Sequence, residues 1–230
     1  MNLDLRQFQE RSLPASEFAD RAFAALEGVP DDIAIHLRVG DVKKLIEEIL
    51  PIAVFAKRFD AIERRVHCKY LGASDDDADA EITLNGRAVD LGFYAERLLI
   101  EATCAEDDKA YLRREALARH GGVFTGKNIR RIGRRGAPES RIESVPDVRD
   151  GGSGPIEMAG AVRAAVDRKA AKKYSPERVL VVRLDPDFPV NDHALARVVQ
   201  HANLAAKYVG LLAIFIVDCS TASIMQTWSR

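Results

Sequence analysis

The chain has 230 residues, of which 47% are hydrophobic and 30% are charged, and its formal net charge is -1 at pH 7. This composition is typical of a folded globular protein, and the length suits one large domain. A net charge this close to zero excludes attraction to nucleic acid or membrane by overall charge, so any electrostatic function has to come from local clusters.

The N-terminal and cysteine patterns indicate the compartment. Residues 1–16 are too polar for a secretion signal, and no apolar run approaches the roughly 18 residues of a membrane span. The three cysteines are widely spaced and form no CxxC pair, which argues against a disulfide framework or a cysteine zinc site. We therefore expect a soluble, cytoplasmic protein with no membrane partner.

The first quarter of the chain predicts helices. Residues 16–28 carry apolar side chains on one helical face and end at Gly28. Residues 40–59 repeat apolar residues at helical spacing, and Pro51 should kink or split that helix. We expect residues 1–39 to form a helical extension of the core.

The middle of the chain predicts a meander of strands followed by a helix. The expected strands are 64–72, 81–93 with the turn signal Asn85-Gly86, and 98–104, and the expected helix is 105–122. Residues 121–155 are rich in Gly, Pro and Arg and have little periodicity, so they predict a long loop or a small excursion.

The C-terminal third alternates helices with apolar strands. Helices are expected at 156–174 and 192–208, and strands at 179–184 and 211–217. Such alternation favours parallel crossovers and a sheet covered on both faces. The predicted fold is one α/β domain over residues 1–230, with a mixed β-sheet flanked by helices and an αβββαβ-type core from residue 40 onward.

Two carboxylates stand out in this meander. Asp90 opens an apolar-rich run, and Glu101 lies inside the apolar strand 98–104. A buried, unpaired carboxylate is costly, and two close carboxylates are relieved by a hard cation such as Mg²⁺ or Mn²⁺. Such a site suits hydrolysis of a phosphodiester. The alternative is that both acids pair with Arg97, Arg87 or a helix lysine.

The order of helix, strand meander with Asp, then Glu-x-x, helix and strand resembles the PD-(D/E)XK superfamily of restriction-endonuclease-like nucleases. The resemblance implies that Asp90 and Glu101 are catalytic and hold the metal, with the Ala102 carbonyl as a further ligand. The chain departs from the family where the motif usually has lysine, because Thr103 stands there.

Some members of the superfamily supply that lysine from the following helix. Val162, Val166 and Lys169 recur on one face of the helix expected here, so Lys169 is the first choice ahead of Lys172 and Lys173. Glutamates of the first helix sometimes add an acid in this family, which makes Glu47 or Glu48 a candidate accessory residue.

A basic segment follows. Guanidinium groups bind phosphates bidentately, and a cationic loop would serve the same substrate as the metal site. The alternative is a solvated loop that balances the acidic residues 75–81. The candidate nucleic-acid-binding residues are Lys127, Arg130, Arg131, Arg134 and Arg135.

Two further motifs are incomplete. Gly121–Asn128 resembles the phosphate-loop pattern GxxxxGK[ST], but Asn128 replaces the hydroxyl residue and a helix precedes the motif instead of a strand. Asp75, Asp77 and Asp79 imitate the start of a calcium loop without its downstream residues.

The leading hypothesis is a Mg²⁺-dependent nuclease that acts on DNA more than RNA. One alternative is a nuclease fold without catalysis, used as a nucleic-acid-binding or assembly module. The other is a nucleotide-binding protein that uses Gly121–Asn128. A homodimer or larger assembly stays open.

Overall fold

A computed structural model of the chain describes most of its residues. The described ranges are 3–30, 32–72, 78–122, 128–146, 153–172, 178–185, 191–204 and 211–229.

A seven-stranded sheet forms the centre of the molecule, with the order β1-β2-β3-β4-β7-β8-β9. Strands β2, β3 and β4 form an antiparallel meander, β4, β7 and β8 are parallel, and β9 is antiparallel to β8. The sheet is therefore mixed, and the predicted α/β class is confirmed. The strands are β1 (Leu13–Pro14), β2 (Arg65–Tyr70), β3 (Ala80–Asn85), β4 (Arg97–Ala105), β7 (Arg178–Leu184), β8 (Leu211–Asp218) and β9 (Ser223–Ser229).

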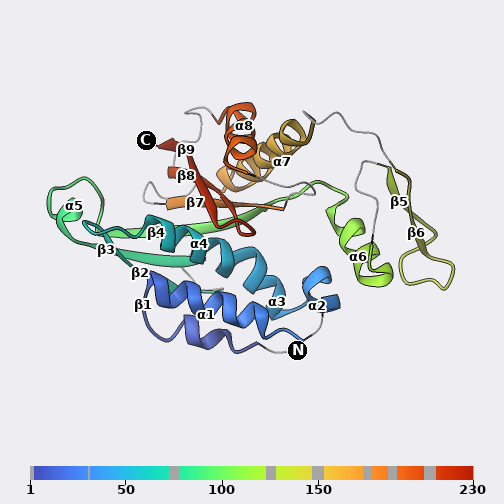
Figure 1. Cartoon of the computed structure of the whole chain (residues 1–230), viewed down its shortest axis with the longest axis horizontal. Helices are drawn as coiled ribbons and strands as arrows, with labels where there is room; N and C mark the ends of the chain where they lie inside the picture. The colour runs from blue at the N-terminus through green and yellow to red at the C-terminus, as the bar shows by residue number, and fades with distance from the viewer. Residues whose placement is uncertain are drawn as a thin grey trace.

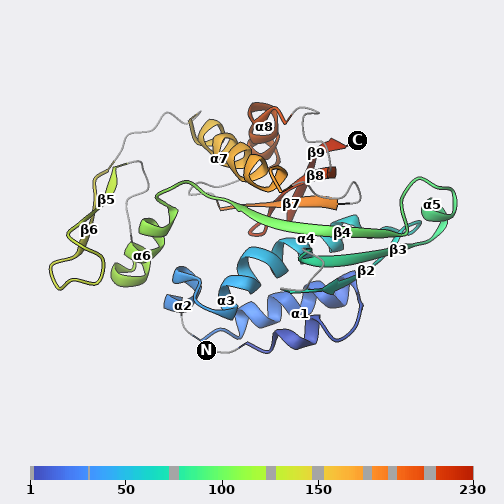
Figure 2. The ribbon, with the colours of Figure 1, turned by 180° about the vertical axis from the view of Figure 1, so that it is seen from behind.

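Helices cover both faces of this sheet (Figure 1). Helices α1 (Ala15–Glu27) and α4 (Leu50–Phe59) lie on one face, and α7 (Ser153–Ala170) and α8 (Asp192–Ala202) lie on the other, as the reverse view in Figure 2 also shows. Each face has its own apolar core, so β4 and β7 are buried from both sides. This explains why their sequences read as continuous apolar runs.

The predicted helix at 40–59 is a continuous helical run with a π turn inside it. It consists of α3 (Asp41–Lys44), the π-helical turn η2 (Leu45–Ile49) and α4. Pro51 is the second residue of α4 and follows the π turn, and the helical run continues past it without a break. The π turn contains Glu47 and Glu48. Its wider turn changes the directions of their side chains relative to those in a regular α-helix.

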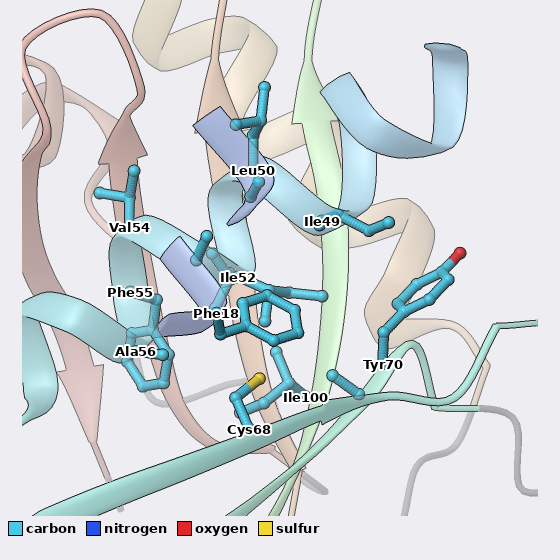
Figure 3. Packing of buried hydrophobic residues seen from close by; sticks show 14 of the residues in the cluster. Phe18, Ile49, Leu50, Ile52, Val54, Phe55, Ala56, Cys68, Tyr70 and Ile100 are labelled. Atoms are coloured by element: carbon cyan, nitrogen blue, oxygen red, sulfur yellow. The ribbon is translucent and has the colours of Figure 1, made fainter. Parts of the chain in front are cut away.

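The core on the α4 face joins the N-terminal segment to the sheet. Phe18 of α1 and Phe55 of α4 are fully buried together with Ile100 of β4 (Figure 3). Replacing either ring with alanine should cost about 3–5 kcal/mol, the range for large-to-small changes in cores. Strand β1 also pairs with β2, and buried residues from Leu5 to Val29 belong to the same core.

The structure corrects the predicted end of α8 and shows what the predicted excursion contains. Helix α8 ends at Ala202 because Asn203 takes a left-handed conformation, φ 43°, and caps it. Residues 128–146 contain the hairpin of β5 (Ile129–Ile132) and β6 (Arg141–Ser144), which lies beside α6 (Ala110–His120) at the opposite end of the molecule from α5 (Arg87–Asp90) (Figure 1). The short helix α2 (Asp32–Leu37) contacts α6.

No helix in the described ranges is both long enough and apolar enough to cross a lipid bilayer.

Candidate active site

Glu101 lies buried in the middle of the sheet. It belongs to β4, opposite Leu180 of the parallel strand β7, and its side chain is 4% exposed. Its neighbours Ile100 and Ala102 point into the core on the α4 face, so strand alternation turns Glu101 toward α7.

Helix α7 meets this carboxylate with a lysine. Val162 and Val166 bury one side of the helix, and Lys169 continues that side and forms an ion pair with Glu101 Oε1. Lys172 Nζ and Arg178 Nη1 are 3.9 and 3.7 Å from the Glu101 oxygens. The Glu101 carboxylate is therefore neutralised by cations from α7 and β7.

Asp90 does not share this site. The prediction placed Asp90 at the start of a strand beside Glu101, but β3 ends at Asn85 and Asp90 closes the short helix α5, exposed to solvent. The physical reason is Gly86, whose φ of 114° starts a longer connection instead of a tight hairpin. The interpretation of Asp90 as a metal ligand next to Glu101 is wrong.

Asp79 takes the position that the prediction gave to Asp90. It directly precedes β3, donates its N–H to the carbonyl of Ile100 at 2.9 Å, and accepts the N–H of Ala102 at 2.7 Å through Oδ2. Two backbone-anchored contacts thus hold the Asp79 carboxylate beside Glu101. Its position immediately before the alternating strand 80–85 is the sequence signal that could have found it.

The environment of Asp79 changes its acidity. Burial and the negative charge of Glu101 raise its pKa from 3.8 to about 7, with Glu48 adding to the rise, while the Ala102 N–H and Lys169 oppose it. Repulsion between two carboxylates is the situation that a divalent cation relieves. Asp79 and Glu101 therefore fit a cation better than either fits alone.

The first-helix glutamates separate at the π turn. Tyr70 donates its hydroxyl hydrogen to Glu48 Oε2, and in Figure 3 the Tyr70 hydroxyl points away from the apolar cluster around Phe18. Burial and this carboxylate raise the pKa of Tyr70. The Glu47 carboxylate instead faces Arg38, with its Oε1 3.4 Å from Arg38 Nη1. Of the two candidates, Glu47 and Glu48, it is Glu48 whose charge affects Asp79.

We call Asp79, Glu101, Lys169 and Glu48 the Glu101 site. Thr103, which replaces the motif lysine, is buried two residues farther along β4 on the same face as Glu101. Within the ranges that the structure describes, no group of three or more His, Cys, Asp or Glu side chains is arranged to hold a metal ion. The protein would therefore contribute two carboxylates to a cation here, a number that Mg²⁺ accepts because it keeps several waters.

A second charged cluster lies where β4 and β7 end. Arg38 is 5% exposed and pairs with Glu106, with Asp185 at 2.5 Å and with Glu47 at 3.4 Å. Arg114 of α6 pairs with Glu106 at 2.9 Å and with Asp185 at 3.3 Å. We call Arg38, Arg114, Arg183, Glu47, Glu106 and Asp185 the arginine cluster.

Charge is balanced in the arginine cluster. Burial opposes ionisation of Asp185, but the charges of Arg183, Arg38 and Arg114 outweigh it and hold the pKa of this carboxyl below its usual range. The cluster connects α6 to the residues that directly follow α2, β4 and β7. These contacts fix the end of the sheet that carries the hairpin.

The predicted basic residues have different roles in the hairpin. Arg131 pairs with the buried Glu115 of α6 at 2.5 Å, and this contact lowers the pKa of Glu115. Arg130 lies 3.3 Å from Glu143, and Arg135 stacks on Tyr111 at 4.6 Å. Arg134 is exposed. Arg131 therefore fastens the hairpin to α6, whereas the side chain of Arg134 faces solvent.

The phosphate-loop motif can be followed only at its ends. Gly121 caps α6 in a left-handed conformation and Asn128 precedes β5, whereas Lys127 and the rest of residues 123–127 lie outside the described residues. A helix precedes the motif, which is not the strand that a nucleotide loop requires.

Comparison of the chain with protein-family models, with curated proteins and with solved structures finds no match.

Proposed function

We propose that the protein is a Mg²⁺-dependent phosphodiesterase that hydrolyses nucleic acid, DNA more than RNA. The observation that carries the proposal is the convergence of Asp79 and Glu101 from adjacent segments of the meander with Lys169 from α7. Two carboxylates and one lysine are the groups that metal-assisted cleavage of a phosphodiester needs.

Asp79 and Glu101 would hold the metal ion. When bound, Mg²⁺ would polarise the phosphate and lower the pKa of a water that attacks it. Asp79, whose pKa is about 7, would release its proton near neutral pH as the cation replaces it. Lys169 would keep a positive charge beside the phosphate oxygens, the task that Thr103 cannot perform.

The proposal is tested with end-labelled single-stranded DNA, duplex DNA and RNA in the presence of Mg²⁺ or Mn²⁺. Wild-type protein should cleave at least one of them, and EDTA should stop the reaction. Asp79→Asn and Glu101→Gln should each lower the rate by on the order of 100-fold or more, because each removes charge from the metal site. Asp90→Asn is the matched control and should keep full activity.

Lys169 needs a separate experiment because it also neutralises the buried Glu101. Lys169→Ala should abolish cleavage, but it also leaves Glu101 less well paired, so its melting curve has to be recorded beside the rate. Lys169→Arg keeps the positive charge and is the control for stability. Full activity in a folded Lys169→Ala protein would contradict the role of this lysine, and Lys172, 3.9 Å from Glu101, would be the next residue to test.

A second function has one observation in its favour. Thr103 stands at the motif lysine, and Lys169 already forms an ion pair with Glu101, so the same fold suits a nuclease-like module that binds nucleic acid without cutting it. Absence of cleavage with every metal and substrate, together with retained DNA binding, would favour this function. We place either activity in the cytoplasm, where the thiols of Cys68, Cys104 and Cys219 stay reduced.

A further inference from the structure

Apolar side chains gather on the surface around α5, at the end of the molecule opposite the hairpin (Figure 1). The turn at 61–64 lies against α5, since the N–H of Ala88 donates to the carbonyl of Glu63 at 3.0 Å. Eight large apolar side chains are exposed among the described residues, and four of them belong to this turn or to the connection from α5 to β4. These four, which we call the α5 patch, are Ile62, Leu91, Phe93 and Tyr94. Such a gathering is typical of an interaction surface.

A cavity of about 570 Å³ opens beside the α5 patch. Phe93 and Tyr94 lie at its edge, and its inner wall includes the buried side chains of Leu98, Val179 and Ala213, near the starts of β4, β7 and β8. The described residues that line the cavity carry no charge. The cavity therefore suits an inserted apolar side chain and disfavours a charged one.

Phe93 projects from the surface next to this cavity. Its side chain is 73% exposed, but its backbone is held, because its N–H donates to the carbonyl of Ala88 at 3.0 Å. The next residue, Tyr94, is anchored by an edge-to-face contact with Phe59, with ring centroids 5.6 Å apart. The same surface thus carries a projecting ring and an apolar cavity. Two copies of it can fit together about a two-fold axis, with each ring in the cavity of the other copy.

The charges around the α5 patch favour a second copy of the chain over an anionic partner. A nucleic acid or an anionic membrane requires an excess of positive charge, whereas this rim has equal numbers of both signs. Across a two-fold axis each cation can meet an acid of the other copy, which guides orientation more than it adds affinity. The exposed charged residues of 61–65 and 87–97 are Arg65, Arg87, Arg97, Glu63, Asp90 and Glu96.

We propose that the α5 patch and its cavity form the interface of a homodimer, in which Phe93 of each protomer inserts into the cavity of its partner. Ile62 and Leu91 pack around the inserted ring. A small molecule in the cavity would leave Ile62, which is 89% exposed, in contact with water, whereas a second protomer covers it. The interface lies on the α4 face of the sheet and Lys169 comes from α7 on the other face, so the proposal does not rest on the nuclease chemistry.

Sedimentation velocity of the full chain, from low micromolar to submillimolar concentration, tests the proposal. Wild-type protein should be dimeric in the upper part of this range. Phe93→Ala removes both inserted rings of the dimer and should weaken dimerisation by about 100-fold or more, because truncating one buried anchor costs at least about tenfold. Ile156→Ala removes an exposed apolar side chain of α7, outside the α5 patch, and should dimerise as wild type does.

A mixing experiment separates ring insertion from general adhesion between apolar surfaces. Ala95→Trp adds a ring at an exposed position in the cavity wall, so it should fill the cavity and make the protein monomeric while Phe93 stays intact. Phe93→Ala keeps the cavity open. An equimolar mixture of the two variants should form heterodimers about tenfold weaker than the wild-type dimer, because one of the two insertions is restored. Melting curves confirm that each variant is folded.

Three results would overturn the proposal. They are a wild-type protein that stays monomeric throughout the concentration range, a folded Phe93→Ala that dimerises as wild type does, and a mixture of the two variants that stays monomeric. Binding of a monomeric wild-type protein to phosphatidylcholine vesicles would assign the α5 patch to a lipid surface instead.

Discussion

The Glu101 site and the arginine cluster both bury charged side chains around β4, but they balance those charges differently. In the arginine cluster three guanidinium groups meet three carboxylates, and the pKa of Asp185 is lowered. In the Glu101 site Lys169 and Arg178 lie against Glu101, whereas burial and the negative charges of Glu101 and Glu48 raise the pKa of Asp79 to about 7.

This difference is the basis for assigning a structural role to the arginine cluster and for proposing a cation site around Glu101. In a balanced cluster the attraction between opposite charges offsets the cost of burying them, so removing one member leaves its partners unpaired and destabilises the fold. A buried carboxylate beside other acids, such as Asp79, is held near its titration point at neutral pH, which costs stability and is typical of sites that bind a cation or transfer a proton.

The largest effect should come from breaking the balance of the arginine cluster. Arg38→Met removes the cation that Glu106 and Asp185 share and should lower the free energy of unfolding by about 3–5 kcal/mol, the usual cost of leaving buried charges unpaired. Urea denaturation at pH 7 measures it. Arg87→Met is the control, because Arg87 is 74% exposed and its pair with Glu63 should contribute less than about 1 kcal/mol. Equal losses in the two variants would show that the cluster is not a structural anchor.

The second-largest effect should be a gain in the stability of the protein when Asp79 of the Glu101 site is replaced by asparagine. The folded protein holds the proton of Asp79 more tightly than the unfolded chain does, because the pKa rises from 3.8 to about 7. This contribution to stability is complete below about pH 4 and is lost as the pH rises through 7. Asp79→Asn removes the penalty and should be more stable than wild type by on the order of 2 kcal/mol at pH 8.

The same variant carries its own control. Asparagine retains an oxygen that can accept the Ala102 N–H, so the variant can keep the hydrogen bond that measures 2.7 Å in the wild type. Below about pH 4 wild-type Asp79 is protonated, and the two proteins should then unfold at the same denaturant concentration. A constant difference at pH 4 and pH 8 would mean that Asp79 does not titrate in this range.

The Glu101 site and the arginine cluster also show how much of the structure could be predicted from the sequence. Apolar runs such as 98–104 and 179–184 predicted the central parallel strands because burial on both faces leaves a continuous pattern. The choice of Lys169 followed from helical spacing, and the structure places it against Glu101. Spacing within one helix is local information, and the sequence carries it directly.

The position of Asp79 needed information that spacing does not give. The prediction counted about ten residues back from Glu101 to Asp90, but the connection after Gly86 is long enough to move Asp90 out of the sheet. The arginine cluster was missed for a related reason, since its residues come from three distant parts of the chain and meet only where β4 and β7 end. These parts contribute Arg38, then Glu106 with Arg114, and Asp185. Local patterns do not report such long-range contacts.

The third effect links the Glu101 site to its proposed cation. If Asp79 must lose a proton with a pKa of about 7 before Mg²⁺ binds, the affinity for Mg²⁺ should rise by about tenfold between pH 6 and pH 8. Calorimetric titration of the wild-type protein at the two pH values measures it. Asp79→Asn should bind weakly at both, and Asp90→Asn should follow the wild type. An affinity independent of pH would mean that the cation does not displace the Asp79 proton.

The smallest effect concerns the hairpin that the arginine cluster holds at the end of the sheet. The exposed side chain of Arg134 is available to a phosphate, whereas Arg131 is bound to Glu115. Arg134→Ala should leave the free energy of unfolding within about 0.5 kcal/mol of wild type, as exposed substitutions usually do. It should also lower the slope of log K against log salt for DNA binding by about 1, since one phosphate contact is lost.

Arg131→Ala should give the opposite result. It removes one of the two arginines that pair with the buried Glu115 and leaves only Arg119, so it should destabilise the hairpin and α6 while changing the salt slope less than Arg134→Ala does. Binding to a duplex oligonucleotide at several salt concentrations, with a melting curve for each variant, measures both quantities. A salt slope that falls only in Arg131→Ala would reverse the assignment and make Arg131, not Arg134, the residue that contacts phosphate.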